Sequence, residues 1–392
     1  MQRATASTIL SFDREDPVIM KKLGFGLMRL PMIETDGGKA VDIELTKQMV
    51  DEYIAAGFTY FDTAWMYCSN QSEAATKEFL VSRYPRDKYT LTTKLPFYKI
   101  KSYEDRDKIF NEQLRKTGVE YFDYYLIHDV NSHTVATFEK YDCFNWLREK
   151  KKQGLVKSMG FSFHDGPEML DRILTEHPDM EFVQLQINYL DWENAGVQSR
   201  ACYEVARKHN KPIIVMEPVK GGMLANVPAD VEEMFRERSP EMSPASWAIR
   251  FAAGLPGVMT VLSGMSDLSQ LRDNMGYMAD FKPLTDDEVA MVHRAADMIN
   301  KNIAIPCTGC AYCIVDCPMN IAIPKCFSLY NADVQEKSTL ERAWTSQEGY
   351  YESLVVNHGK ASDCIKCGSC EEMCPQHLPI RELLEKVAKQ FE

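Results

Sequence analysis

The sequence of 392 residues has no long apolar run, no concentration of basic residues and no apolar stretch in its first 20 residues of the kind a signal peptide needs. No window approaches the roughly 18 consecutive apolar residues that span a bilayer, so we expect no membrane span. The net charge of −12 argues against a nucleic-acid or anionic-membrane partner, because those surfaces are bound by clustered lysine and arginine. Met1–Met20 carries Asp13, Glu15 and Asp16 where a signal peptide needs an apolar core. We therefore expect a cytoplasmic protein.

The chain also lacks the Gly-x-Gly-x-x-Gly turn that follows the first strand of a dinucleotide-binding open sheet. Short apolar runs still alternate with helical patterns such as 44–56, 105–117 and 197–210. This alternation predicts an α/β fold, a (β/α)8 TIM barrel over residues 1–281, with a doubly wound open sheet as the alternative. The predicted strands are 23–27, 58–62, 89–94, 122–128, 156–162, 182–187, 212–217 and 258–263.

Eight of the twelve cysteines form two runs of the same spacing, C-x2-C-x2-C-x3-C-P, near the C-terminus. This spacing is typical of bacterial ferredoxins with two [4Fe–4S] clusters, in which the fourth cysteine of each run ligates the other cluster. Zinc needs only two pairs of ligands, and a disulfide framework is not needed in a chain of this length. The predicted ligand sets are Cys307, Cys310, Cys313 and Cys374 for one cluster, and Cys364, Cys367, Cys370 and Cys317 for the other.

The segments around the cysteine runs predict helices. A capping box at Thr285–Glu288 begins a helix that runs to about residue 300, so residues 282–306 are predicted as a helical linker. Residues 307–392 are predicted as a small α-helical, ferredoxin-like dicluster domain, with helical segments at 327–330, 339–344, 350–354 and 379–391. The four other cysteines are expected to be ordinary buried thiols: Cys68, Cys143, Cys202 and Cys326.

Titratable side chains fall at the ends of several predicted strands. Asp62 ends the second strand, Lys94 the third, His128 the fourth and Glu217 the seventh, and Tyr67 follows Asp62 closely. Active sites of TIM barrels lie at the C-terminal ends of the strands, so we expect these groups to converge. The structural alternative is a salt bridge between Asp62 and Lys94 with Tyr67 packed nearby.

The run GFTYFDTA at 57–64 followed by Tyr67, then Thr93-Lys94 and Leu126-Ile127-His128, resembles the aldo/keto reductase superfamily over roughly residues 20–280. Together with the cysteines, the chain resembles the ferredoxin-fused branch of that superfamily. The resemblance implies a small carbonyl or alcohol substrate and a catalytic tetrad of Asp62, Tyr67, Lys94 and His128. Tyr67 would be the general acid, Lys94 would lower its pKa, Asp62 would fix the lysine and His128 would orient the carbonyl.

The resemblance also implies an NAD(P)H site. Ser162 and Gln184 would bind the carboxamide, and Met216 would cover the nicotinamide ring in place of the usual aromatic residue. An exposed amide and a cation at Gly221 and Lys220 would meet the pyrophosphate. The adenosine end would involve Ser263, Gly264, Gln270 and Asn274.

The choice between NADH and NADPH stays open. The basic residues that usually bind the 2′-phosphate are absent, and Asp267 and Asp273 add negative charge. Arg272 is the only nearby cation in the local sequence.

These features predict a cytoplasmic iron–sulfur oxidoreductase of the aldo/keto reductase type. Clusters carry single electrons, whereas nicotinamide gives up a hydride. A flavin could connect the two cofactors, because it accepts a hydride and passes on single electrons. One alternative is a cluster-driven reductase without nicotinamide. Another is an electron-transfer component of a larger redox complex, with an external donor or acceptor protein. The clusters could also be structural.

Overall fold

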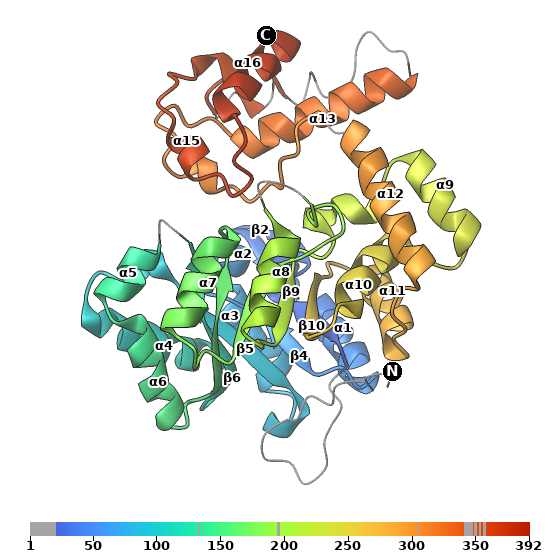
Figure 1. Ribbon diagram of the computed structural model, residues 1–392. Coiled ribbons are helices and arrows are strands. Elements are labelled where there is room, and N and C mark those ends of the chain that lie inside the picture. Colours follow the sequence, from blue (N-terminus) through green and yellow to red (C-terminus); the bar gives the residue numbers. More distant parts are fainter. Residues whose placement is uncertain are drawn as a thin grey trace.

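The structure is a computed structural model that describes residues 21–131, 134–193, 197–302, 304–340, 348, 351–352, 354–355 and 358–392. Its larger part is a closed barrel of parallel strands (Figure 1), which confirms the (β/α)8 prediction. The first strand pairs with both the last and the second of the barrel strands, so the open-sheet alternative is wrong. The barrel strands, in chain order, are β1 (Leu23–Gly26), β4 (Tyr60–Asp62), β5 (Thr90–Leu95), β6 (Phe122–Val130), β7 (Val156–Phe163), β8 (Phe182–Gln186), β9 (Ile213–Met216) and β10 (Val258–Gly264).

Helices cover the outside of the barrel, and the three helical segments named from the sequence are confirmed. The longer ones are α1 (Ile43–Ala55), α3 (Ser72–Thr76) with η2 (Lys77–Val81), α4 (Tyr103–Thr117), α5 (Val135–Lys140), α6 (Cys143–Lys152), α7 (Pro167–Glu176), α8 (Ser199–Lys208), α9 (Ala229–Arg238), α10 (Pro244–Gly254) and α11 (Leu268–Ala279). Short turns of helix and one hairpin lie in the loops: η1 (Leu27–Arg29), β2 (Met32–Thr35), β3 (Gly38–Val41), α2 (Tyr67–Asn70), η3 (Arg86–Lys88), η4 (Phe97–Lys99) and η5 (Lys220–Ala225). Residues 1–20 of the predicted barrel domain lie outside the described residues.

The interior of the barrel is filled by side chains from alternate strand positions. Tyr60, Leu126, Phe182 and Ile214 belong to one buried cluster inside the barrel. Successive strand residues point to opposite faces, so the residue two positions further on points inward again, one layer closer to the C-terminal mouth. This alternation brings polar side chains from several strands into one layer at the mouth.

Gly160 on β7 is required by this packing. A Cβ atom at position 160 would lie 2.5 Å from the carbonyl oxygen of Phe182 and 2.8 Å from its ring. The missing side chain therefore leaves the space that the Phe182 ring occupies inside the barrel.

Most of the segment predicted as a linker packs on the barrel domain. Helix α12 (Asp286–Asn302) begins at the predicted capping box, with the Thr285 amide donating to Glu288 Oε2 at 2.9 Å. Its apolar residues Val292, Ala295 and Ile299 are buried in the barrel's core cluster. The apolar face of α12 thus packs against α9 and α10, whereas Ile305, further along the predicted linker, belongs to the core of the C-terminal domain.

The C-terminal domain is small and mostly helical. Its described elements are η6 (Tyr312–Ile314), α13 (Ile323–Leu340), η7 (Ala361–Asp363), α15 (Ser369–Glu372) and α16 (Ile380–Phe391). Its own buried core includes Cys313, Cys370 and Cys374 beside Ile323 and Leu384. The helices predicted at 327–330 and 379–391 are confirmed, whereas 341–344 and parts of 350–354 lie outside the described residues.

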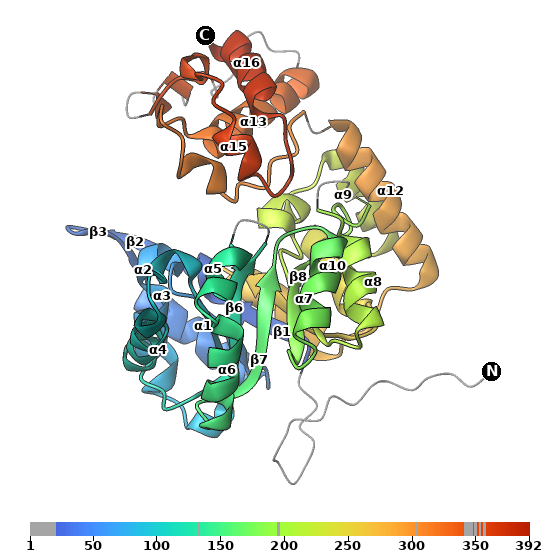
Figure 2. The same ribbon diagram turned by 60° about the vertical axis from the view of Figure 1, so that its left-hand side comes forward.

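The two domains meet at the C-terminal end of the barrel. The arrowhead of β7 points toward the C-terminal domain (Figure 2), which lies over the ends of the barrel strands. The domain therefore stands where the loops of a TIM barrel form the active face.

Candidate functional site

Lys94 on β5 is the centre of the predicted site. Its side chain is 1% exposed, and its amino group donates to Asp62 Oδ1 at 2.5 Å, to the Thr63 carbonyl at 2.8 Å and to the Tyr67 hydroxyl at 3.2 Å. An ammonium group has three donors, and all three are used here. Burial lowers the pKa of Lys94 and raises the pKa of Asp62, although each charge partly offsets the shift in the other.

A buried polar network holds the backbone of Lys94. Glu73, fully buried on α3, accepts hydrogen bonds from Thr93 at 2.8 Å and from Gln113 at 2.7 Å. The same Gln113 amide donates to the Lys94 carbonyl at 2.9 Å. Sequence reasoning missed Glu73 and Gln113, since both lie on helices, away from the strand ends where active-site groups were sought.

Tyr67 is presented by a strained turn. The residues that follow it, Cys68, Ser69 and Asn70, have φ values of 49°, 55° and 69°. Three successive left-handed residues without glycine are unfavourable and persist only when their surroundings hold them. Here Ser72 anchors the turn, because its hydroxyl hydrogen-bonds Thr63 at 2.8 Å and donates to the Leu27 carbonyl at 3.0 Å.

The sequence analysis expected Lys94 to lower the pKa of Tyr67, and other effects outweigh any such lowering. Burial and the negative charges of Asp62 and Glu217 raise the pKa of Tyr67 well above its usual value. The tyrosine ring keeps some exposure at the mouth, but the surroundings of its hydroxyl are buried. Lys94 does not reverse the shift because its charge is compensated by Asp62. The Tyr67 hydroxyl is therefore a neutral proton donor at neutral pH.

His128 stands opposite Tyr67. The two rings meet edge to face with their centroids 6.3 Å apart. Burial, together with the neighbouring Lys94 and His164, holds the pKa of His128 well below its usual value, so the imidazole is neutral. The next residue, Asp129, has a left-handed φ of 63°, and its amide donates to Ser162 Oγ at 2.8 Å.

A groove of about 620 Å³ is lined in part by Glu217, one of the residues whose charge acts on Tyr67, and it is large enough for a sizeable ligand. The predicted coenzyme residues that line it are Gly221, Ser263, Gly264, Gln270 and Asn274. Arg29, on η1, is the only lysine or arginine among the described residues of its lining. The sequence analysis missed Arg29, because only the spatial approach of η1 to Gly264 brings it there.

The three residues predicted at the nicotinamide lie on neighbouring strands at the mouth: Ser162, Gln184 and Met216. Gln184 is 1% exposed, and its Oε1 atom has no hydrogen-bond partner among the described residues. A buried acceptor without a donor is costly unless a ligand supplies one. An amide N–H of a bound carboxamide has the required chemistry.

Lys220 is not the exposed cation that the sequence analysis expected. Its side chain is 1% exposed and forms a buried ion pair with Asp191, which also accepts from Gln186 and Asn188. The amide of Gly221 donates to Glu217 Oε2 at 2.6 Å, so it is not free either. Neither group is available to a pyrophosphate in this structure, because both are used to hold the loop after β9.

Arg272 likewise does not reach the groove. Its guanidinium makes two hydrogen bonds to Glu52 on α1, at 2.6 and 2.8 Å. Asp273 lies in the groove and accepts from Ser243 at 2.6 Å. The groove therefore has little positive charge with which to attract phosphate groups.

The cysteines of the two runs surround two cavities in the C-terminal domain. Each cavity has four cysteines in its lining, grouped as the sequence predicts: Cys307, Cys310, Cys313 and Cys374 in one, and Cys317, Cys364, Cys367 and Cys370 in the other. Among the described residues, no three His, Cys, Asp or Glu side chains converge closely enough for a single metal ion. Four thiolates around a shared space are the donor set of a [4Fe–4S] cluster.

The remaining four cysteines lie apart from these cavities. Cys143, Cys202 and Cys326 are buried, as expected, and Cys68 is half-buried beside Tyr67. Every helix in the described part of the chain is too short or too polar to cross a membrane.

Comparisons with known proteins agree with this arrangement. Residues 22–297 match the model of the aldo/keto reductase family, and residues 306–378 match a 4Fe-4S dicluster domain. An oxidoreductase of Bacillus subtilis, YqkF, is 22% identical over 69% of this chain and 90% of its own length. The 9,11-endoperoxide prostaglandin H2 reductase of Trypanosoma cruzi is 23% identical over 68% of this chain and 87% of its own.

A solved structure shares the fold of the barrel. An aldo-keto reductase from Klebsiella pneumoniae, in complex with NADPH, superposes with a TM-score of 0.54. It is 19% identical and the match covers 70% of this chain and 90% of that protein.

The role of Lys220 can be tested by its removal. We expect Lys220→Met to lower the free energy of unfolding by about 3–5 kcal/mol, because Asp191 would be left as an unpaired buried charge. The matched control is Lys282→Met, whose side chain is 78% exposed and which should be neutral. Thermal unfolding of both variants is the measurement. Equal stability of the two would contradict a structural role for Lys220.

Proposed function

Since the chain belongs to the aldo/keto reductase family and carries a 4Fe-4S dicluster domain, we propose that it is a cytoplasmic oxidoreductase that interconverts a small carbonyl compound and its alcohol. The observation that carries the proposal is the buried group of Asp62, Lys94, Tyr67 and His128, with Lys94 in hydrogen-bond contact with Tyr67. Reduction of a carbonyl consumes two electrons and two protons and yields the alcohol. These residues handle the protons and the charge on oxygen.

Tyr67 is the proton donor in this proposal. Its raised pKa keeps the hydroxyl protonated, so it can donate a hydrogen bond to a carbonyl oxygen and then transfer the proton to the developing alkoxide. Lys94, 3.2 Å away, stabilises the phenolate that is left. The neutral imidazole of His128 offers an N–H on the other side of the oxygen and fixes its position. Asp62 keeps Lys94 in place.

The groove and Gln184 support a nicotinamide coenzyme. Gln184 would accept from the carboxamide, Ser162 and Met216 would border the ring, and the residues around Gly264, Gln270 and Asn274 would hold the adenosine end. When bound, the coenzyme supplies a hydride to the carbonyl carbon. Arg29, whose guanidinium lies 3.9 Å from Glu217, would be the residue to meet a phosphate.

The cysteine cavities support two [4Fe–4S] clusters. We assign Cys307, Cys310, Cys313 and Cys374 to the first cluster, and Cys317, Cys364, Cys367 and Cys370 to the second. When bound, the clusters supply electrons one at a time. Such a domain also suits an external electron-donor or acceptor protein.

A second candidate is a reductase that receives its electrons through the clusters without nicotinamide. The scarcity of positive charge in the groove favours it, since Glu217 and Asp273 line the groove and Arg29 is the single cation among its described residues. The tetrad would have the same task in both candidates, because the carbonyl oxygen must be protonated in either case.

The role of Tyr67 is tested by Tyr67→Phe. We expect kcat for aldehyde reduction to fall by at least about a hundredfold, because the proton donor is lost while the ring remains. Exposed Tyr103→Phe, on α4, is the matched control. The measurement is steady-state turnover of a panel of small aldehydes. Turnover of Tyr67→Phe at the control rate would contradict the proposal.

The pH dependence gives a further readout of the same residue. Since the pKa of Tyr67 is raised above its ordinary value near 10, reduction by the wild type should not lose activity through tyrosine ionisation between about pH 6 and pH 9. Alcohol oxidation requires the deprotonated group, so its rate should rise with pH over the same range. A decline of the reduction rate with a midpoint near neutral pH would place the proton donor elsewhere.

The cluster assignment is tested by Cys374→Ala. We expect this variant to lose about half of its iron, since each [4Fe–4S] cluster has four cysteine ligands. Cys326→Ala removes a buried thiol of the same domain that lines neither cavity and should keep its iron. Iron analysis and electron paramagnetic resonance of the reduced proteins are the measurements. Full iron content in Cys374→Ala would contradict the assignment.

The electron source is tested by anaerobic titration of the cluster-loaded protein with NADH and then with NADPH. We expect both coenzymes to bleach the visible iron–sulfur absorption. NADH should do so at lower concentrations than NADPH, because the groove has little positive charge to bind a 2′-phosphate. Bleaching would be compatible with a flavin that passes electrons from the coenzyme to the clusters. A bound flavin would be detected by the fluorescence of the supernatant after the protein is denatured. If dithionite bleaches the protein and neither coenzyme does, the second candidate replaces the first.

A further inference from the structure

The C-terminal domain brings one aromatic side chain to the mouth of the barrel. Tyr312 lies between Cys310 and Cys313 and begins the short helix η6. Gly309 and Ala311, just before it, have φ values of 69° and 67°. A left-handed alanine is uncommon, and such positions concentrate where the surrounding structure holds a functional side chain. The loop thus turns Tyr312 out of the cysteine run.

The neighbours of Tyr312 are residues of the barrel mouth. Its ring meets the ring of His164, which follows β7, edge to face with the centroids 6.4 Å apart. Asp129, Glu217 and Tyr67 are near enough to Tyr312 to interact with it electrostatically. His164 in turn lies near His128. Glu217 therefore acts on both Tyr312 and Tyr67, and the two tyrosines act on each other.

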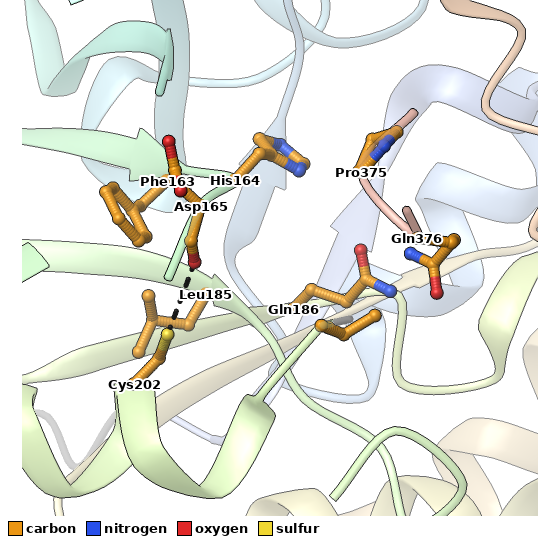
Figure 3. A pocket seen from close by; sticks show the side chains of 9 residues that line it. Phe163, His164, Asp165, Leu185, Gln186, Cys202, Pro375 and Gln376 are labelled. Atoms are coloured by element: carbon orange, nitrogen blue, oxygen red, sulfur yellow. Dashed lines mark hydrogen bonds between the residues drawn. The ribbon is translucent and has the colours of Figure 1, made fainter. Parts of the chain in front are cut away.

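The domain contacts the barrel at two further places. A Cβ atom added to Gly221 in the loop after β9 would lie 3.4 Å from the carbonyl oxygen of Thr308. A cavity of about 20 Å³ lies between His164 and Gln186 of the barrel and Pro375 and Gln376 of the C-terminal domain (Figure 3). This cavity has room for about one water molecule.

We propose that Tyr312 is a substrate-positioning residue that forms the outer wall of the carbonyl site, so that the substrate is enclosed between the barrel and the first cysteine run. This inference rests on the proposed function. It names the substrate class more narrowly, as a compact, uncharged carbonyl compound with an apolar or aromatic face that packs on the Tyr312 ring. An anionic substrate would meet the carboxylates of Asp129 and Glu217 beside this ring.

The test compares three variants of the cluster-loaded protein: Tyr312→Leu, Tyr312→Phe and, as the control, Tyr330→Leu. Tyr330 is half-buried on α13 in the same domain. For benzaldehyde we expect Tyr312→Leu to raise KM about tenfold with a smaller change in kcat, because the aromatic wall is lost. Tyr312→Phe keeps the ring and should resemble the wild type. The KM for butanal should rise less than the KM for benzaldehyde in Tyr312→Leu, since butanal has no aromatic face.

A second readout does not depend on turnover. The side chain of His128 is 8% exposed, and we expect Tyr312→Leu to speed its modification by diethyl pyrocarbonate, measured on the His128 peptide by mass spectrometry. Tyr330→Leu should leave the rate unchanged, and iron content should be the same in all variants. An unchanged modification rate at His128, or an unchanged KM for benzaldehyde in Tyr312→Leu, would overturn the inference. Absence of aldehyde turnover in the wild type would instead overturn the proposed function, while the modification rate would still decide whether Tyr312 covers the site.

Discussion

A single buried ammonium group, that of Lys94, sets the requirements for the rest of the site. A charge removed from water is costly unless all of its donors are paired. Lys94 meets this requirement only because β4 supplies Asp62, the following loop supplies the Thr63 carbonyl, and Tyr67 supplies its hydroxyl. The closure of the barrel in its observed register is therefore what makes the tetrad stable. The proposed reaction needs the same closure, since its proton donor must lie where the lysine can reach it.

Residues on several elements around Lys94 hold this group of side chains in place. The Glu73–Gln113 network fixes the backbone of Lys94, and the left-handed turn at Cys68 and Ser69 holds Tyr67 over it. On the far side of the mouth, the ion pair of Lys220 and Asp191 holds the loop that carries Glu217. The site is thus a layer of buried charges and neutral donors. Burial and compensating charges, rather than free cations, determine which groups are protonated.

The C-terminal domain lies beside the mouth of the barrel. A TIM barrel by itself leaves its C-terminal mouth to its own loops, whereas here a second domain lies over the strand ends (Figure 2), and its Tyr312 ring contacts the ring of His164, which follows β7. The cavity of Cys307, Cys310, Cys313 and Cys374 includes Gln376, which also borders the junction with the barrel. The dicluster domain and the mouth of the barrel are therefore neighbours in space, although more than 200 residues of chain lie between Tyr67 and Tyr312.

The sequence by itself determined the strands, the two cysteine runs and the inward direction of Asp62, Lys94 and His128. These features follow from period-two alternation and from ligand spacing, and both patterns are contained within short stretches of the sequence. Only the tertiary structure decided which charges are buried. Lys220 reads as a loop cation but is paired with Asp191, Arg29 enters the groove in place of Arg272, and burial raises the pKa of Tyr67 against the effect of Lys94. Such outcomes depend on contacts between distant segments, because desolvation and pairing are properties of the closed barrel and its covering domain rather than of any stretch of sequence.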